Sequence, residues 1–202
     1  MTALDELNRY RSRGADRDVL DALLDEVKVG VLSTVVDGLP WSVPMLFARV
    51  GDRILLHGST GAGALRQVAT GAPATFTVFA LDGLVVAETL FDHSANYRSA
   101  VIRGCLEMVE ADEADVLRSL SDKLIPGRAS EVPTITGKET AATLTLSMAI
   151  GDDNWLCKAR SGGPAEGSGD TWTGVIPVSL QFGDPVTATG DEPPASVRSL
   201  RR

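Results

Sequence analysis

A loop of small residues, Gly58 to Gly63, carries the clearest chemistry in this sequence. It follows an apolar run that ends at His57, and it precedes a helical spacing through Leu65, Val68 and Ala69. A strand, a tight turn and a helix start in this order aim several backbone N–H groups and the positive end of a helix dipole at one point, which suits a phosphate or another anion. The segment matches neither the dinucleotide-binding nor the P-loop fingerprint, so an ordinary connection between a strand and a helix is the competing interpretation.

Three further groups of residues could bind an anion or a planar ring. They are Arg66 after the loop, the run Tyr97-Arg98-Ser99 at the start of a strand, and the run from Lys158 to Arg160. Arg98 or Lys158 beside a helix N-terminus would form a phosphate site through charge-assisted hydrogen bonds, whereas an outward-facing strand position is the alternative for Arg98. Tryptophan rings would serve either as walls for a planar ligand or as core, and the candidates are Trp41, Trp155 and Trp172.

The other reactive side chains predict neither a metal site nor a nucleophile. His57 and His93, the two histidines, lie outside any metal-binding spacing, and no serine or cysteine has a dedicated base. Cys105 and Cys157 fit no C-x-x-C pattern and are expected to be reduced thiols. The net charge of −8 argues against a general nucleic-acid binder. Because the sequence shows neither a signal peptide nor a membrane-spanning run, we expect a cytoplasmic protein that does not bind membranes.

Short strands separated by few helices must position these residues. Residues 16–28 show helical spacing with Asp16 as the N-cap, and Asp37-Gly38 predicts a tight hairpin between strands over 29–36 and 40–50. Pro44 cannot donate to a ladder, so its strand must be bulged or lie at an edge there, which leaves backbone free to meet a ligand.

The second half of the chain continues the alternation of strands and turns. Asp82-Gly83 predicts a turn, and Gly104 predicts a bulge. The other predicted elements are a strand over 53–57, a short helix after the glycine loop, strands over 73–81, 84–90, 97–109 and 141–150, a helix over 111–124, a loop over 152–169 and an apolar run over 172–182. This order predicts a mainly β fold, a closed or partly closed antiparallel barrel, between an N-terminal extension (1–15) and a mobile C-terminal tail (183–202).

In this order the segments resemble the pyridoxamine phosphate oxidase-like FMN-binding split-barrel family, and within it the flavin-nucleotide-binding members that include nitroimidazole-resistance reductases. The resemblance rests on VGVLSTVVDGLPWSVPMLFARVGDRILLHGSTGAGALRQV, NYRSAVIRGCLEMVE, KLIPGR, CKARSGGP and WTGVIPV. It implies a six-stranded antiparallel split β-barrel with a few flanking helices over residues 16–182, a homodimer, and FMN in grooves at the subunit interface.

The resemblance also implies a set of cofactor-binding residues, drawn from two neighbouring strands, a loop and the later segments. Val43, Pro44 and Met45 would lay their backbone along the isoalloxazine ring, with His57 and Gly58 near the ribityl chain. Ser59, Thr60 and Gly61 would donate to the phosphate, and Arg98 and Ser99 would contact phosphate or ring. Lys158, Arg160 and Trp172 match a C-terminal motif that lies near the flavin in the family, from the same or the other subunit.

The loop departs from the family pattern, because it reads STGAGA where many relatives carry a lysine, an arginine or a second histidine. A deazaflavin or haem therefore stays open beside FMN. We expect a flavin-dependent oxidoreductase that reduces a small electrophilic molecule through the cofactor's own chemistry, with no catalytic side chain assigned. The alternative is a non-catalytic flavin- or haem-binding sensor, with His57 or His93 as the haem ligand. The substrate-phosphate residues of true pyridoxamine phosphate oxidases are not recognisable, so that reaction is not assigned.

Overall fold

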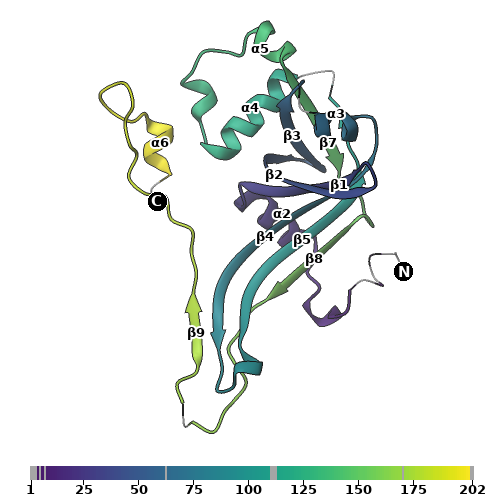
Figure 1. Cartoon of the computed structure of the whole chain (residues 1–202). Helices are drawn as coiled ribbons and strands as arrows, with labels where there is room; N and C mark the ends of the chain where they lie inside the picture. The colour runs from purple at the N-terminus through teal and green to yellow at the C-terminus, as the bar shows by residue number, and fades with distance from the viewer. Residues whose placement is uncertain are drawn as a thin grey trace.

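A computed structural model describes residues 4, 6, 8–61, 63–109, 113–169 and 171–200. In these residues nine strands form one antiparallel sheet in the order β6-β7-β3-β2-β1-β4-β5-β8, with β9 paired to β4. The strands are β1 Val29–Val36, β2 Leu39–Val50, β3 Arg53–Ser59, β4 Pro73–Val86, β5 Ser94–Cys105, β6 Glu107–Met108, β7 Thr143–Ala149, β8 Trp155–Arg160 and β9 Gly174–Pro177. Figure 1 shows a curled sheet with helices around it, the body, and a long arm built from β4, β5, β8 and β9.

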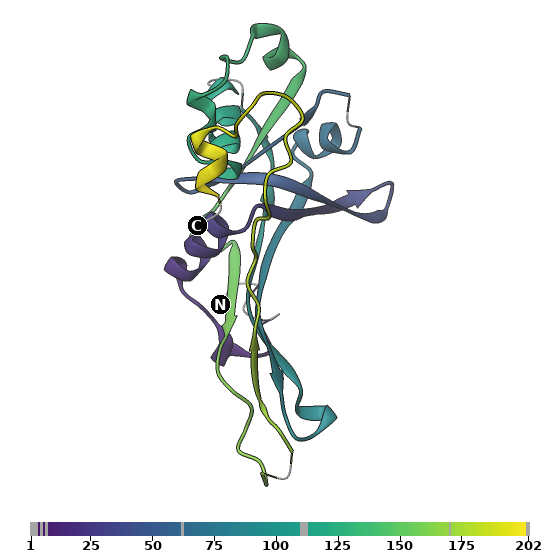
Figure 2. The same cartoon turned by 90° about the vertical axis from the view of Figure 1, so that its left-hand side faces the viewer.

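This architecture confirms the predicted mainly β split barrel, although more strands are present than the six expected. Two of the additional strands, β6 and β9, have only two and four residues, too few for a recognisable pattern. Figure 2 shows the same arm from the side, as a thin extension below the body.

Short helices flank the sheet. They are α2 Arg17–Glu26, α3 Gly63–Ala69, α4 Glu113–Leu124, α5 Gly137–Ala141 and α6 Ala195–Ser199, with 3-10 turns η1 Arg11–Arg13, η2 Leu90–Asp92 and η3 Arg128–Ser130. The predicted N-cap of α2 is confirmed, since the Asp16 side chain accepts from the Val19 N–H at 3.1 Å. The predicted helix over 111–124 is confirmed from Glu113, while its first two residues lie outside the described ones.

The main core lies between α2 and the inner face of the sheet. Leu20, Leu23 and Leu24, which are spaced to share one side of α2, are all fully buried. Beneath them the rings of Phe47 and Phe76 meet edge to face with 5.0 Å between centroids. A second cluster seats α4 on the other side of the sheet; it consists of Ala48, Leu55, Val116 and Leu120.

The first hairpin follows the sequence closely. Asp37 and Gly38 both have positive φ, 51° and 76°, and Val36 pairs directly with Leu39. Two central residues with positive φ are those of a type I′ turn, which matches the twist of the strands, so the predicted hairpin is confirmed.

The predicted turn at Asp82-Gly83 is wrong, because β4 runs through it from Pro73 to Val86. The register with β5 shifts between Leu81 and Gly83, so the chain absorbs Asp82 as a β-bulge. The predicted bulge at Gly104 is also wrong, since Gly104 pairs with Ala74 in unbroken register. Local sequence marks both sites as irregular, but only the long pairing of β4 with β5 decides where the extra residue falls.

Two helices appear where none was expected. Thr136 and Glu139 form a reciprocal capping box that starts α5, just before β7. In the segment predicted as a tail, α6 places Ser196 in a buried position, and its backbone N–H donates to Glu131 Oε1 at 3.1 Å. Part of the segment predicted as a mobile tail is therefore helical and attached to the body through Ser196.

Candidate functional site

The sheet opens into a split between β2 and β3. Their pairing runs from Val50 and Arg53 to Phe47 and Leu56 and goes no further within the described residues. Beyond that point β2 pairs with β1, from Leu46 to Leu39, while β3 continues along β7 to Ser59. Backbone groups on the two edges that face the split thus have no strand partner there, and they are available to a bound ligand.

Pro44 lies on the split side of β2, in the part that pairs with β1 alone. The pairing of β1 and β2 is regular across it, with Val31 opposite Pro44. Of the two predicted explanations, the edge position is therefore confirmed and the bulge is not. A proline at this edge removes one donor and keeps another strand from closing the split.

A groove of about 410 Å³ occupies the split. It brings together six of the predicted cofactor-binding residues and three others. The predicted ones are Val43, Pro44, Met45, His57, Gly58 and Ser59, and the additional ones are Trp41, Leu46 and Leu65. The lining is mostly apolar with a few polar groups, which is the composition of a site for a flat organic ligand.

Gly58 sets the width of the groove at its α3 end. A Cβ at this position would lie 2.2 Å from Leu65 Cδ1, so the glycine lets Leu65 approach β3 and close the end of the groove. Trp41 reaches the groove because it shares the inner side of β2 with Val43 and Met45. The sequence shows that Trp41 alternates with Val43 and Met45 along one strand. It does not show which side of that strand faces the groove.

His57 supplies the titratable group of the groove. Burial lowers the pKa of its imidazole below the ordinary value, which leaves the ring neutral at neutral pH. The side chain is half-buried and hydrogen-bonds no described residue. A neutral imidazole that faces a groove can donate, accept or ligate a metal through one ring nitrogen.

The loop after β3 divides its donors between two directions. The Gly61 N–H donates to Ser59 Oγ at 3.2 Å, while the Thr60 N–H donates to the Ala142 carbonyl at 3.3 Å. The backbone N–H of Thr60, predicted as a phosphate donor, is thus already hydrogen-bonded. Thr60 also lines a second hollow of about 320 Å³. That hollow is also lined by Arg66, Ala69, Thr70, Met108 and Leu144. Among the described residues no carboxylate pairs with Arg66.

Arg98 does not line the groove. It lies on β5 beside the bulge, where Nε and Nη2 donate to Asp82 at 3.0 and 2.7 Å. Nη1 and Nη2 donate to the carboxylate of Glu26 at 2.7 and 3.0 Å. Hydrogen bonds to these two carboxylates raise the pKa of the guanidinium, and they occupy its donors. The structure places Arg98 in a link between α2 and the arm.

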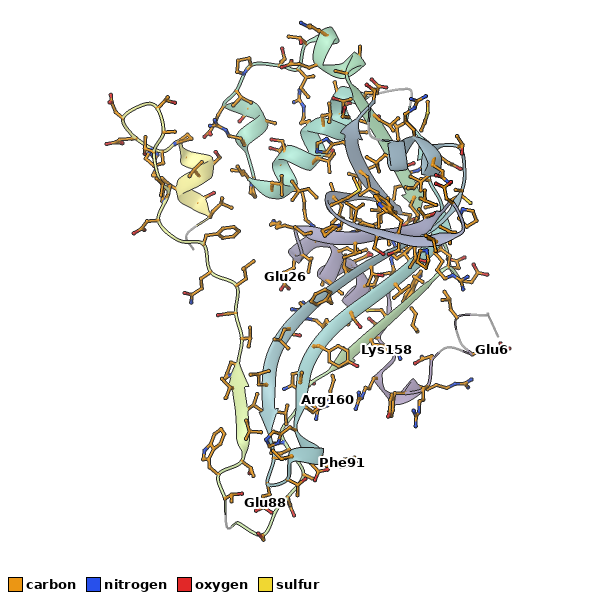
Figure 3. The ribbon with its side chains drawn as sticks, in the orientation of Figure 1. Glu6, Glu26, Glu88, Phe91, Lys158 and Arg160 are labelled. Atoms are coloured by element: carbon orange, nitrogen blue, oxygen red, sulfur yellow. The ribbon has the colours of Figure 1, made fainter. Side chains whose placement is uncertain are left out.

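The remaining predicted residues lie on the arm, away from the groove of their own chain. Ser99 pairs with Lys158 across β5 and β8, and Figure 3 shows Lys158 and Arg160 along β8. Arg160 Nη1 donates to Asn96 Oδ1 at 2.7 Å and to the Ala95 carbonyl at 3.2 Å. Trp172 is 66% exposed beside β9. One chain therefore presents two separate sets, the groove set and the arm set.

Other kinds of site find little support in the described residues. They contain no group of three His, Cys, Asp or Glu side chains that could hold a metal ion. No helix in the described part of the chain is long and apolar enough to cross a membrane. Burial raises the pKa of the Cys157 thiol to about 11, which makes it unreactive at neutral pH.

The profile of the family described as Pyridoxamine 5'-phosphate oxidase matches residues 16–153. The chain belongs to this family. The expected resemblance is thereby confirmed, and the match spans both edges of the groove, most of the arm and α4. No curated protein sequence matches the chain.

Two solved structures resemble the chain over nearly its whole length, and a third shares the fold over a smaller part. The FAD and haem binding protein from Mycobacterium smegmatis is 43% identical with a TM-score of 0.89, covering 94% of this chain and 97% of that one. A flavocytochrome from Azotobacter vinelandii is 30% identical with a TM-score of 0.85, covering 96% and 94%. A putative 5-nitroimidazole resistance protein from Bacteroides thetaiotaomicron shares the fold at 16% identity, with a TM-score of 0.59 over 71% and 83%.

Proposed function

We propose that this protein is a flavin-dependent oxidoreductase that binds the flavin ring in the split groove and reduces a small molecule. The observation that carries the proposal is the unpaired split between β2 and β3 with its apolar groove of about 410 Å³. An isoalloxazine ring has two apolar faces and a hydrogen-bonding edge. Free strand edges would bind that edge, while Trp41, Val43 and Met45 cover a face.

The chain's own residues then bind and orient the cofactor. Backbone groups of Val43 to Met45 would fix the ring, Leu65 would keep water from the α3 end, and neutral His57 would place one polar nitrogen in the groove. A bound flavin supplies transfer of a hydride or of single electrons. No acidic or basic side chain is required by this scheme.

The nucleotide end of the flavin falls toward the loop and α3. Arg66 is the nearby cation without a carboxylate partner among the described residues, so we propose that it binds phosphate. The second hollow, lined by Thr60, Arg66 and Met108, offers space beyond the loop for more than the single phosphate of FMN. Because a 43% identical relative is described as FAD-binding, we propose FAD, with FMN as the alternative.

A homodimer is part of the proposal. Ser99, Lys158, Arg160 and Trp172 lie on the arm, where they cannot reach the groove of their own chain. An arm from a second copy would bring these polar and aromatic side chains to the groove and complete the flavin site. Each groove would then be built by two chains, as the family resemblance implies.

Absorbance spectroscopy of the purified protein tests the proposal. We expect flavin bands, or their appearance when the apoprotein is titrated with FAD, FMN and riboflavin in parallel. Tighter binding of FAD than of FMN would support use of the second hollow, and equal binding would favour FMN. A protein that takes up none of the three would overturn the flavin assignment. Loss of binding in Gly58→Val, with retention in Gly63→Ala, would locate the ligand in the groove, since a Cβ at Gly63 meets nothing within 4 Å.

Haem binding is the second candidate, because one relative is described as binding FAD and haem and another as a flavocytochrome. His57 fits the ligand role, since burial keeps its ring neutral. His93 Nδ1 accepts from the Ala87 N–H at 3.3 Å, and ligation through Nε2 would require that bond to be lost. Haem titration of the wild type, His57→Ala and His93→Ala should show a Soret band that changes only in His57→Ala. A band that is unchanged in both variants would exclude histidine ligation.

A further inference from the structure

The C-terminal strap, defined here as residues 176–182, begins in β9 and continues beyond the end of this strand. The Val178 N–H donates to the Asp82 carbonyl at 3.0 Å, and residues 179–182 belong to no strand. Figure 1 shows this segment rising from β9 toward α6. The chain is next attached at α6, where Ser196 hydrogen-bonds Glu131. The strap thus leaves β9 at a fixed point and lies in the stretch of chain that leads to this second attachment.

The strap presents an apolar stripe to solvent. Ile176, Val178, Leu180 and Phe182 alternate with Pro177, Ser179 and Gln181, and the four apolar side chains are 48%, 40%, 82% and 48% exposed. Alternation with a period of two puts the four on one side of an extended chain. Ordering such a segment costs conformational entropy, and burial of the stripe against a surface would offset that cost.

The outer face of the sheet has the matching character. Strand register places Val29, Leu46, Phe79 and Leu81 on this face, and they are 47%, 40%, 65% and 44% exposed. Leu84 and Ile176 extend the face along the arm, because the extra residue Asp82 shifts the alternation and even-numbered residues of β4 face outward beyond it. A contiguous exposed apolar face of this kind marks an interaction surface.

Charge distinguishes the two surfaces and makes them complementary. On β1, β4, β5, β8 and β9 the charged residues that the register places on the outer face are the cations Arg103, Lys158 and Arg160. Toward β3 and β6 the same face carries Arg53 and Glu107, which form an ion pair. Between Arg160 and Arg198 the sequence contains five acidic residues and no Lys, Arg or His. The strap itself is uncharged but is flanked on both sides by acidic residues alone, whereas the arm part of the outer face carries only cations. Such opposition favours their association and sets its orientation.

We propose that the strap of each chain lies on the outer face of a second copy of this chain. It cannot fold onto its own outer face, because β9 is tied to the edge of β4 and α6 draws the chain toward Glu131. A two-fold pair satisfies both chains at once, since each gives a strap and each receives one. This inference rests on the proposed homodimer and specifies which segment holds it together.

The test compares two double variants of the full-length apoprotein by analytical ultracentrifugation. Leu180→Glu/Phe182→Glu places two charges on the stripe. Ser179→Glu/Gln181→Glu adds the same charge to the same segment on the opposite side. We expect the first to raise the dimer dissociation constant by about 10- to 100-fold and the second to change it less than about threefold. All four positions are exposed in the single chain, so circular dichroism should show unchanged folding.

Each outcome has one meaning. A monomeric wild type would overturn both the strap and the dimer, whereas a wild-type dimer that Leu180→Glu/Phe182→Glu leaves intact would overturn the strap alone. An equal rise of the dimer dissociation constant in the two double variants would indicate a general effect of charge. It would also overturn the proposal that the apolar stripe contacts the second copy. Flavin titration of the same samples is read separately, so a failure to bind flavin is distinguished from a failure to pair.

Discussion

The body and the arm use their apolar side chains in opposite ways. In the body, α2 and the inner face of the sheet bury Leu20, Leu32 and Phe76, the last of them on β4, completely. On the arm, Phe79 and Leu81 from the same β4 stay 65% and 44% exposed. A single strand thus contributes to a finished core on one side and to an unfinished surface on the other. The difference indicates that the body folds for itself, while the outer face of the arm is shaped for something that the chain alone does not supply.

The sharpest way to break this comparison is a pair of substitutions on β4. Phe76→Ala removes a fully buried ring and should lower the free energy of unfolding by about 3 to 5 kcal/mol. Phe79→Ala removes an exposed ring three residues away and should cost less than about 0.5 kcal/mol in dilute apoprotein, where copies are apart. Urea unfolding measures both. A similar cost for the two would mean that the single chain already buries its outer face.

A second prediction concerns Lys123, which lies in the last turn of α4 and reaches α2 with its side chain. Its Nζ hydrogen-bonds the Leu24 carbonyl and sits 4.8 Å above the Phe47 ring. Burial, followed by the nearby Lys28, lowers its pKa from 10.5 to about 8. Between pH 8 and 10.5 the unfolded chain therefore binds more protons at this site than the folded one, so stability should rise with pH across that window, by about 1 to 2 kcal/mol after solvent screening.

The measurement is urea unfolding at several pH values for the wild type and Lys123→Met. The raised pKa of Cys157 acts in the opposite sense from about pH 9 to 11, because there the folded state holds the extra proton. The difference between the two proteins removes this contribution. An identical pH dependence of stability in both proteins would show that folding does not lower the pKa of Lys123.

A third and smaller effect separates two arginines. Arg66→Ala should weaken binding of FAD or FMN by about tenfold, leave riboflavin affinity unchanged and leave stability unchanged, because its proposed partner is phosphate. Arg98→Ala should do the reverse, since it leaves Glu26 and Asp82 without their shared cation. Nucleotide titration and unfolding of both variants provide the readings. Loss of nucleotide affinity in Arg98→Ala alone would restore the phosphate role first predicted for it.

Sequence reasoning succeeded where the signal is local. Asp37-Gly38 needs only its own backbone preferences to form the hairpin, and Asp16 needs only the next three residues to cap α2. The groove residues Val43 to Met45 and His57 to Ser59 were predictable because a strand pair and its following loop carry the family resemblance in one continuous stretch.

It failed where a distant partner decides. Arg98 looks like an anion binder until Glu26, 72 residues away, and the bulged Asp82 occupy its donors. Leu65 enters the groove only because Gly58 lets α3 come close. The stripe on the strap is visible as alternation in the sequence, but its meaning depends on where β4 stops pairing with β9, which no local pattern records.

The bulge at Asp82 adds one residue to β4 without exchanging the two faces of the arm. Before it, odd-numbered residues of β4 face outward; after it, even-numbered ones do, as exposed Leu84 and buried Val85 show. Removal of this one residue would join Leu81 directly to Gly83 and restore a regular ladder, in which Leu84 still faces outward and Val85 still faces inward. Arg98 would lose the carboxylate of Asp82 and keep its hydrogen bonds to Glu26, which link the arm to α2. A single inserted residue therefore changes which numbered positions of β4 face outward, while the apolar face of the arm stays continuous.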